Sequence, residues 1–467
     1  MFCSGKLPMA GVLAVGLLFG AAADAMPSEG TQSAVMEESV SIPDLEGLER
    51  TGGVREFEPT EGAPLGTLAV DPELRQIGLS REISYTTVYH GGTKLFYQTS
   101  TELFLSDGDG RSMMSSKNFP QLAGALEEYN FRERKTSSKA RNQMRKQALG
   151  ELQEREKTHT ESSFHAYYDH SNVLVKRADA CALSFLHNVG SFTNGVHGMY
   201  AVQGENFDTQ TGKRLELIDV FMNVESLPDI IINRLRETYD SRTFFESMES
   251  TVTKSILEGS VDWTLGARGV TFYFNPYAIG PYASGILKAD ILFDERPGIF
   301  REKYKRGAAS YCEELPIWQD TGVSLRDDGM GKRDILRIGT ETGHISICLN
   351  GKKFRDEQPV KEISPVFVHL NDGRNYVYVD CVSDAFGMEH RELRVYSLND
   401  AVPSGCGILR FSFQRNGHIK DGDTEKIRYW IMTDPNEFCM DEFAPSDQGN
   451  SKTHVVEVGS GGTPAFG

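Results

Sequence analysis

The chain has 467 residues, of which 39% are hydrophobic and 10% aromatic. This length exceeds what one hydrophobic core usually holds, and the composition can bury a core, so we expect two or three globular domains and exclude a disordered protein. The formal net charge of −17 disfavours nucleic acid as a partner and favours cationic partners.

The first 25 residues have the pattern of an export signal. Lys6 precedes an apolar run over residues 9–19, and Ala23-Asp24-Ala25 fits a small-x-small cleavage site. The apolar run is shorter than the ~20 residues that a membrane-spanning helix needs. We therefore expect a signal peptide over residues 1–25, an extracytoplasmic (periplasmic or secreted) location, and no membrane span after cleavage. An uncleaved membrane anchor is the alternative, because the two patterns overlap.

A flexible leader is expected over residues 26–80, which are rich in Glu, Pro, Gly and Ser and poor in aromatic residues. Structure is expected to begin near Arg81. Two β-rich runs, residues 82–89 and 94–98, flank Gly91-Gly92 and predict a hairpin, with residues 102–105 as a third strand.

A long helix is predicted from Phe119-Pro120 to Lys157, because apolar residues recur at helical spacing and breakers are few. Between Arg132 and Lys157, nine Lys/Arg residues stand against four Asp/Glu residues. This local positive charge suits an anionic wall polymer, although a solvated helix face explains the same pattern more simply.

The region from 179 to 305 is organised around a predicted hairpin over residues 194–213, where Gly, Asn and Asp supply turn chemistry between two β-type runs. After the hairpin, Ser226-x-Pro228-Asp229 predicts a helix start that resembles a capping box. The helical pattern is expected to break near Asp240-Ser241. Strands are then predicted over residues 270–274 and 287–293.

Two blocks of this region carry a family resemblance. The first is Asn194-Gly195-Val196-His197-Gly198-x-Tyr200 with Asn206-Phe207-Asp208-x-x-Thr211-Gly212-Lys213. The second is Phe272-Tyr273-Phe274-Asn275-Pro276-Tyr277-x-Ile279-x-Pro281-Tyr282-Ala283-x-Gly285. In order and spacing they resemble the C-terminal extracytoplasmic domain family of the anti-sigma factor RsiV, over residues 179–305. Residues 81–178 are similar to the module that precedes this domain in RsiV and in PdaC-type peptidoglycan deacetylases.

The resemblance implies a recognition role at the bacterial cell wall, since this region of RsiV senses lysozyme by binding it. The sigma-binding segment and the transmembrane helix of RsiV are not found in this sequence, so the anti-sigma role is not implied. The deacetylase role is not implied either, because the Asp-Asp pair and the His-x-x-x-His metal set are missing.

We therefore expect a non-catalytic binding protein of the bacterial envelope, without a cofactor or a bound metal. Its expected partner is a lysozyme-like muramidase or a cell-wall glycan. The alternative is a cell-wall polysaccharide hydrolase or deacetylase whose active site has no recognisable motif.

The last third predicts an all-β domain over residues 306–447, a sandwich or a partial propeller, followed by a disordered Gly/Ser-rich tail over 448–467. Seven short apolar runs are separated by turn residues, over residues 335–338, 344–348, 366–370, 376–381, 393–398, 408–413 and 427–432. This domain is expected to fold separately from the rest. The whole chain is thus predicted to be α+β, with an RsiV-like mixed sheet and helices followed by an all-β domain.

Candidate ligand-binding residues come from the two family blocks and from one strand of the all-β domain, where tyrosines alternate with apolar residues. On that strand an exposed binding platform and a strand buried on both faces fit the pattern about equally well. The candidates are Asn194, His197, Tyr200, Tyr277, Tyr282, Tyr376 and Tyr378.

Six cysteines follow the predicted signal peptide, an even number that is typical of disulfides in an exported chain. They are Cys181, Cys312, Cys348, Cys381, Cys406 and Cys439. We expect at least one disulfide among the five that lie beyond residue 306; buried free thiols are the alternative.

Overall fold

The computed structural model describes residues 70–71, 75–106, 116–323, 325, 334–385, 388–411, 419–421, 424–435, 437–443, 451–459 and 462–466. All of them belong to one compact unit, residues 44–467. The predicted signal peptide and residues 26–69 of the predicted leader lie outside the described residues. Among the helices of the described ranges, none is both long enough and apolar enough to cross a bilayer.

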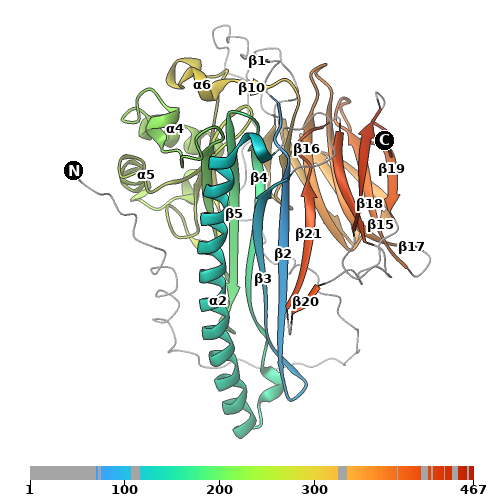
Figure 1. The fold of residues 1–467 in the computed structure, drawn as a ribbon. Coiled ribbons are helices and arrows are strands. Elements are labelled where there is room, and N and C mark those ends of the chain that lie inside the picture. Colours follow the sequence, from blue (N-terminus) through green and yellow to red (C-terminus); the bar gives the residue numbers. More distant parts are fainter. Residues whose placement is uncertain are drawn as a thin grey trace. The chain divides into compact units, whose positions relative to one another are not determined.

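The fold is α+β, as predicted, and strands dominate it (Figure 1). A seven-stranded sheet has the order β20-β21-β2-β3-β4-β5-β6. Its strands are β2 (Leu79–His90), β3 (Thr93–Leu105), β4 (Tyr167–Ala178), β5 (Ala182–Phe192), β6 (Met199–Asp208), β20 (Ile419–Asp421) and β21 (Thr424–Ile431).

The first hairpin predicted for this sheet is present, and the second lies at other residues than predicted. β2 and β3 pair on either side of Gly91 and Gly92, whose φ angles of 55° and 87° suit glycine. The third strand predicted at 102–105 is instead the end of β3. The hairpin predicted over residues 194–213 is instead formed by β5 and β6: residues 194–198 lie in the loop between these strands, and β6 pairs with the strand before the predicted span. Order begins before Arg81, since Ile77 and Leu79 are fully buried.

Helix α2 (Pro120–Lys157) has the predicted bounds and connects β3 to β4. These strands pair in parallel, which requires a crossover of this kind. Figure 1 shows α2 lying along the sheet. Its buried side chains, which include Leu122, Leu126, Tyr129, Met144 and Leu152, pack against residues of the sheet in two apolar clusters.

A three-stranded sheet of β7 (Asp262–Leu265), β8 (Gly269–Phe274) and β9 (Leu287–Leu292) packs on β5 and β6, where Leu186, Val202 and Tyr273 form one cluster. The other face of this sheet is covered by α4 (Leu227–Thr238) and α5 (Met248–Leu257). The predicted break between the two helices is confirmed by η3 (Ser241–Thr243). The predicted capping box is not formed, since the side chain of Ser226 makes no cap hydrogen bond.

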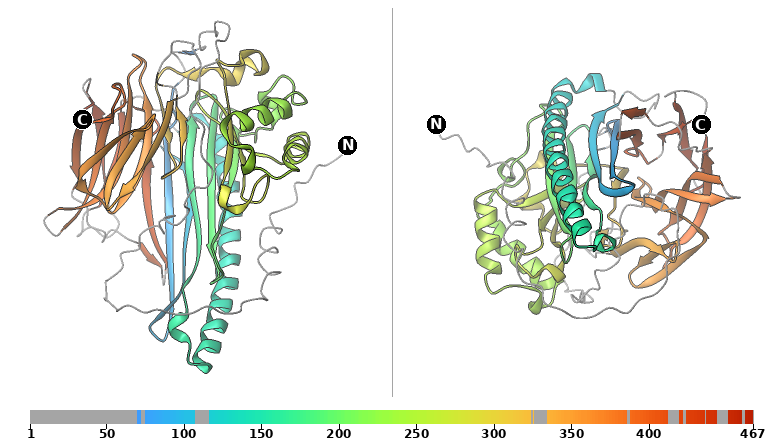
Figure 2. Two further views of the ribbon diagram at one scale, coloured as in Figure 1. Left: turned by 180° about the vertical axis from the view of Figure 1, so that it is seen from behind. Right: turned by 90° about the horizontal axis from the view of Figure 1, so that it is seen from below.

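The C-terminal strands form a sandwich, one of the two architectures predicted. A five-stranded sheet (β11-β16-β17-β18-β19) and a four-stranded sheet (β12-β13-β14-β15) share an apolar core that includes Ile338, Ile347, Phe367 and Val379. These strands run in orange to red in Figure 2. Their bounds are β11 (Tyr311–Glu314), β12 (Thr321–Val323), β13 (Asp334–Glu341), β14 (His344–Leu349), β15 (Lys352–Pro359), β16 (Glu362–His369), β17 (Asn375–Ala385), β18 (Met388–Ser397) and β19 (Ser404–Phe411).

The predicted disordered tail is wrong. Strands β23 (Ser451–Val458) and β24 (Pro464–Phe466) form a small sheet with β22 (Glu437–Phe443). This sheet covers the second face of the five-stranded sheet, where Phe438 and Val456 are buried against its tyrosines and valines. The tail is ordered because a few apolar residues among its glycines and serines fit this face. Every strand predicted in the last third is present.

The strands of the chain are not divided at residue 306 as predicted. β21 pairs with β2, so the hydroxyls of Thr86 and Thr424, 338 residues apart in the sequence, lie 2.9 Å from each other. On β11, Glu314 accepts hydrogen bonds from the guanidinium of Arg81 and from the backbone N of Val175. The residue pattern of a strand indicates which of its faces is buried, but it does not indicate which distant strand it pairs with.

The remaining elements are β1 (Val70–Asp71), η1 (Ser116–Asn118), η2 (Glu161–Ser163), α3 (Leu217–Val220), η4 (Tyr282–Ser284), η5 (Pro297–Ile299), α6 (Glu302–Lys305) and β10 (Gly307–Ala308).

Candidate functional site

The two sequence blocks that carry the resemblance lie against each other at β6. This strand ends the seven-stranded sheet, so its outer backbone groups need partners other than a neighbouring strand. The side-chain amide of Asn275 supplies them: its Nδ2 donates to the carbonyl of Val202 over 3.0 Å, and its Oδ1 accepts from the N–H of Val202 over 2.7 Å. Nearby, the hydroxyl of Tyr282 donates to the carbonyl of Gly198 over 2.6 Å.

Tyr282 is the centre of an aromatic group. The ring of His197 stacks on it at 4.0 Å between centroids and 26° between planes. The ring of Tyr200 meets it edge-on at 5.4 Å, and the ring of Tyr277 lies 5.7 Å away. Four predicted candidate residues, two from each block, therefore form one ring cluster.

The cluster continues onto the sheet through Tyr168. A Cβ at position 198 would lie 2.6 Å from the Tyr168 hydroxyl, so Gly198 permits this ring to lie against the loop. Tyr168 in turn packs against Tyr97 at 5.5 Å and Phe192 at 5.8 Å. We call the seven rings the aromatic patch: Tyr97, Tyr168, Phe192, His197, Tyr200, Tyr277 and Tyr282.

The aromatic patch faces solvent. Each of its seven residues is half-buried or exposed. Tyr277 is 53% exposed, and the neighbouring Val196 and Met199 are also exposed apolar side chains. Isolated exposed apolar residues are ordinary, but a contiguous group of aromatic rings is typical of a binding surface.

Two residues of the patch region have strained backbone conformations. Tyr277 has φ 68° and Asn194 has φ 59°. Asparagine tolerates this left-handed region, whereas for a bulky residue such as tyrosine it is a genuine outlier that costs ~1–3 kcal/mol. The backbone N of Tyr277 donates to the carbonyl of Gly280 over 3.1 Å, which holds the turn. The strain places an exposed ring beside Tyr282.

The loop before β6 is anchored to α2 through Glu151. This carboxylate accepts hydrogen bonds from the amide of Asn194, from the hydroxyl of Tyr167 over 2.6 Å and from Nε of Arg155 over 2.8 Å. Burial alone would raise the pKa of Glu151, but the three donors outweigh it and lower that pKa. Asn194 is therefore a positioning residue at the edge of the patch.

Three phenols of the patch, those of Tyr168, Tyr200 and Tyr282, have raised pKa values and keep their protons at neutral pH. Burial, followed by the proximity of Tyr282, raises the pKa of Tyr200 to about 12. Burial, followed by Tyr168 and Tyr277, also raises the pKa of Tyr282, and burial raises that of Tyr168. These three side chains therefore offer apolar ring faces together with hydroxyl donors.

The structure brings five of the seven candidate ligand-binding residues together, Asn194 included, but not Tyr376 and Tyr378. Tyr376 is only 3% exposed and Tyr378 is 0% exposed, because both pack under the sheet of β22, β23 and β24. The platform predicted on this strand is therefore wrong, because β17 is buried on both faces. The sequence analysis missed Tyr97, Tyr168 and Phe192. Tyr97 stands in a predicted strand, yet only the parallel pairing of β3 with β4 places it beside Tyr168.

The disulfide prediction is contradicted for five of the six cysteines. Cys181, Cys312, Cys348, Cys381 and Cys406 are free thiols in the structure. Cys312 and Cys381 illustrate the reason, because they lie on the same sheet but in apolar clusters on its two opposite faces. The side chain of Cys439 lies outside the described residues.

A second polar group lies between α2 and the sheet. Ser171 Oγ is 2.7 Å from His187 Nε2, and Glu133 Oε2 is 3.6 Å from the same nitrogen. A catalytic relay needs the hydroxyl and the carboxylate on the two different ring nitrogens, so this arrangement is not one. Burial, then Glu205, raises the pKa of Glu133 to about 7, and burial, then His170, lowers that of His187 to about 4.

The described residues hold no group of three or more His, Cys, Asp or Glu side chains that could bind a metal ion. A hollow of about 270 Å³ lies at one end of the sandwich, between the turns at Asn350 and Gly373. The amides there are engaged in the fold: Asn350 donates to Asp334 over 2.6 Å, and Asn375 donates to the carbonyl of Leu325 over 2.9 Å. The aromatic patch therefore remains the stronger candidate site.

The fold and the patch define a strand-rich α+β protein with an exposed aromatic surface. The model of a family described as "Protein of unknown function (DUF3298)" matches residues 219–294, from α3 to the end of β9. No curated protein matches the chain. Two solved structures are similar. A DUF3298 family member from Bacteroides fragilis NCTC 9343 is 19% identical, with 51% of this chain and 96% of that chain covered and a TM-score of 0.34. A DUF3298 family protein from Pseudomonas aeruginosa PAO1 is 15% identical, with 51% and 99% covered and a TM-score of 0.30.

Proposed function

We propose that the chain is an exported, non-catalytic binding protein of the bacterial envelope, of the RsiV-like type, and that its aromatic patch recognises a lysozyme-type muramidase. One observation carries the proposal: the two sequence blocks that resemble the RsiV family contribute rings to the same exposed cluster around Tyr282. The resemblance of these blocks to the RsiV domain supplies the choice of partner.

The chemistry of the patch supports a protein partner. Tyrosine offers a large, rigid contact area together with a hydroxyl donor, and it is enriched at the energetic centres of protein interfaces. The patch combines five tyrosines with one histidine and one phenylalanine. The exposed Tyr277 ring is suited to enter a pocket of the partner, because the hydrogen bond from its backbone N to the carbonyl of Gly280 holds the turn that carries it.

The charge of the chain supports a basic partner. Lysozymes are commonly basic, and a formal net charge of −17 would attract them at long range. Such steering weakens as the Debye length falls from ~10 Å at 0.1 M salt to ~3 Å at 1 M. A fitted interface should retain part of its affinity under those conditions, whereas nonspecific ion exchange should not.

A non-catalytic role is consistent with the polar groups described above. The Ser171, His187 and Glu133 side chains do not have relay geometry, and the patch itself offers aromatic rings rather than converging carboxylates. The predicted alternative, a wall-polymer hydrolase or deacetylase, has no candidate site among these residues.

Titration calorimetry with several lysozymes tests the proposal. We expect saturable binding at ~0.1 M salt that persists at ~0.3 M. An unrelated basic protein of similar charge should bind weakly or not at all, and purified wall fragments should not compete. Absence of saturable binding to every lysozyme at low salt would refute the proposal. Competition by wall fragments would assign the patch to a cell-wall glycan instead.

A further inference from the structure

The middle of α2 has a row of basic side chains on its solvent side. Residues 134–150 include six Lys/Arg residues and no Asp or Glu. Lys135, Lys139, Arg145 and Lys146 are exposed, while Ser137, Ala140, Met144 and Ala148 of the same segment are buried against the sheet. We call the four exposed cations the basic ridge. At 1.5 Å per residue it is about 17 Å long.

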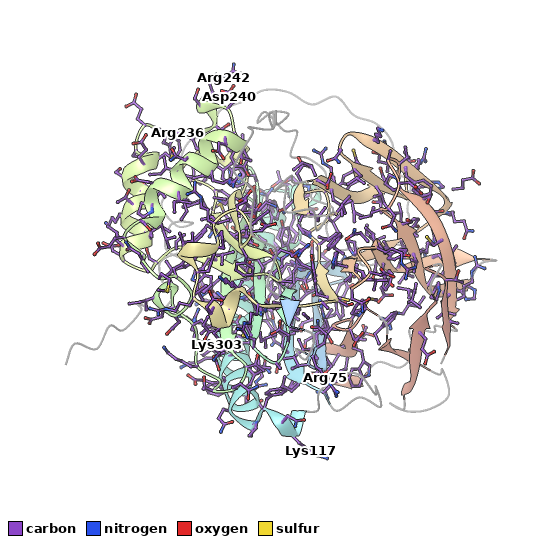
Figure 3. All side chains as sticks on the ribbon, turned by 90° about the horizontal axis from the view of Figure 1, so that it is seen from above. Arg75, Lys117, Arg236, Asp240, Arg242 and Lys303 are labelled. Atoms are coloured by element: carbon purple, nitrogen blue, oxygen red, sulfur yellow. The ribbon has the colours of Figure 1, made fainter. Side chains whose placement is uncertain are left out.

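The cations of the basic ridge differ from three other cations of α2. None of the four forms an ion pair with a side chain of the described ranges, whereas Arg134, Arg155 and Lys157 on the same helix pair with nearby glutamates. Figure 3 shows Arg242 and Asp240 side by side on another face of the molecule. Arg242 pairs with Asp240, and Arg236 pairs with Glu249.

This arrangement costs helix stability. Lys135 and Lys139 are four residues apart, as are Arg141 and Arg145, and like charges at this spacing repel each other and destabilise a helix. The helix uses stabilising acidic partners at both ends but omits them in the middle. A chain with a net charge of −17 thus keeps one concentrated positive surface.

We propose that the basic ridge binds a linear anionic polymer with repeating phosphate or carboxylate groups. Successive cations at Lys135, Lys139 and Lys146 lie on one side of the helix at intervals of about 6 Å and 10 Å. A row of this kind matches a chain of repeated charges better than a single small anion. No described helix or strand lies over the outer side of α2 (Figure 1), so within the described ranges an extended ligand has access to its length.

The structure argues against a membrane surface as the partner. Helices that lie on membranes bury an apolar face in the lipid. The apolar face of α2 is already packed on the sheet, and the side chains between the ridge cations are Thr136, Ser138, Asn142 and Gln143. Charge complementarity is therefore the recognition chemistry, and it calls for a polymer in solution or in the cell wall.

The test is binding of the full chain to polyphosphate and to polygalacturonate, measured by fluorescence anisotropy between 50 and 200 mM salt. Four contacts predict a slope of log K against log salt of about −3. The variant K135Q/K139Q/K146Q should reduce the slope to about −1 and weaken binding at 50 mM salt by at least about tenfold. Binding to only one of the two polymers would identify phosphate or carboxylate as the natural group.

A matched control removes three positive charges elsewhere. The variant R236Q/R242Q/K254Q changes the net charge equally and should bind both polymers as the unmodified chain does. Equal losses in the two triple variants would overturn the proposal, as would equal affinity for duplex DNA of the same charge, because either result means unspecific ion exchange. Glutamine is a good helix former and removes the repulsion between Lys135 and Lys139, so the ridge variant should be at least as stable as the unmodified chain; thermal unfolding checks that both variants are folded. This surface is separate from the aromatic patch, and loss of the Tyr277 ring should leave polymer binding unchanged.

Discussion

Tyr277 combines an exposed ring with a backbone conformation that disfavours any side chain. Its φ of 68° costs energy in the folded state, and its ring is 53% exposed and therefore buries little area in return. A residue of this kind is retained more readily for recognition than for stability. The same position separates the two properties experimentally.

We expect Tyr277→Gly to be more stable than Tyr277→Ala by about 1 kcal/mol, because both lack the ring but only alanine keeps the steric strain of a Cβ at positive φ. Denaturant unfolding of the two variants measures the difference. Equal stability, or a more stable alanine variant, would show that the backbone at 277 is not strained in solution.

The candidate residues of the sequence analysis succeeded where a motif fixed local geometry. Asn194 and Tyr282 belong to blocks whose turns place their side chains on the surface. Tyr376 failed because alternation of tyrosine and valine looks the same whether one face of a strand is exposed or both are covered. The covering strands, β23 and β24, lie in a segment whose composition predicts disorder.

At the scale of elements, α2 was predictable and its surroundings were not. Pro120 begins the helix and apolar residues at helical spacing continue it to Lys157. Its role as a crossover between parallel strands depends on which strands pair. The same pairing creates the polar group beneath the helix. There Glu133 of α2 faces His187 on β5 and lies near Asp169 on β4 and Glu205 on β6.

The docking of α2 should depend on pH through Glu133. Its pKa is raised to about 7 in the folded state, against 4.5 ordinarily. Its contribution to stability is therefore fully present below about pH 4.5 and is lost as pH rises through 7. His187 acts in the opposite direction: its pKa is lowered to about 4, so its contribution is present above about pH 6.5 and is lost as pH falls.

Glu133→Gln removes only the first of these contributions. We expect the free energy of unfolding of the variant, relative to the unmodified chain, to increase by about 1–3 kcal/mol between pH 5 and pH 8. Thermal unfolding at the two pH values measures it. The control is Glu128→Gln, an exposed glutamate on the same helix, which should give the same difference at both pH values. An equal effect of pH on the two variants would contradict a buried, proton-binding Glu133.

At the scale of the whole molecule, the N-terminal and C-terminal strands depend on each other. β21 pairs with β2 from Leu79–Ile431 to Thr86–Thr424, and Ile431 is part of the apolar cluster under α2. The sequence analysis predicted strands both before and after residue 306 but assigned them to separate domains. The residue pattern changes near 306, whereas the strand pairing crosses this boundary.

A fragment of residues 75–310 should therefore fail to fold cooperatively. It lacks β21, so one side of β2 would be an unpaired edge, and it lacks Glu314, which accepts from Arg81 and from the backbone of Val175. Aggregation, or a broad thermal transition with exposed apolar surface, is the expected result. A sharp transition close to that of the full chain would instead support a separable all-β domain.

The central claim is that the aromatic patch recognises a lysozyme-type protein. The most direct test measures the dissociation constant of one lysozyme for the Tyr277→Gly variant and for the unmodified chain, and compares the two. Calorimetry at ~0.15 M salt, where long-range steering is screened, measures both. Phe131→Ala, which removes an equally exposed ring from α2, is the matched control. We predict a loss of about tenfold or more for Tyr277→Gly, which corresponds to 1.4 kcal/mol, and no loss for the control. Equal affinity of the Tyr277→Gly variant and the unmodified chain would contradict the claim.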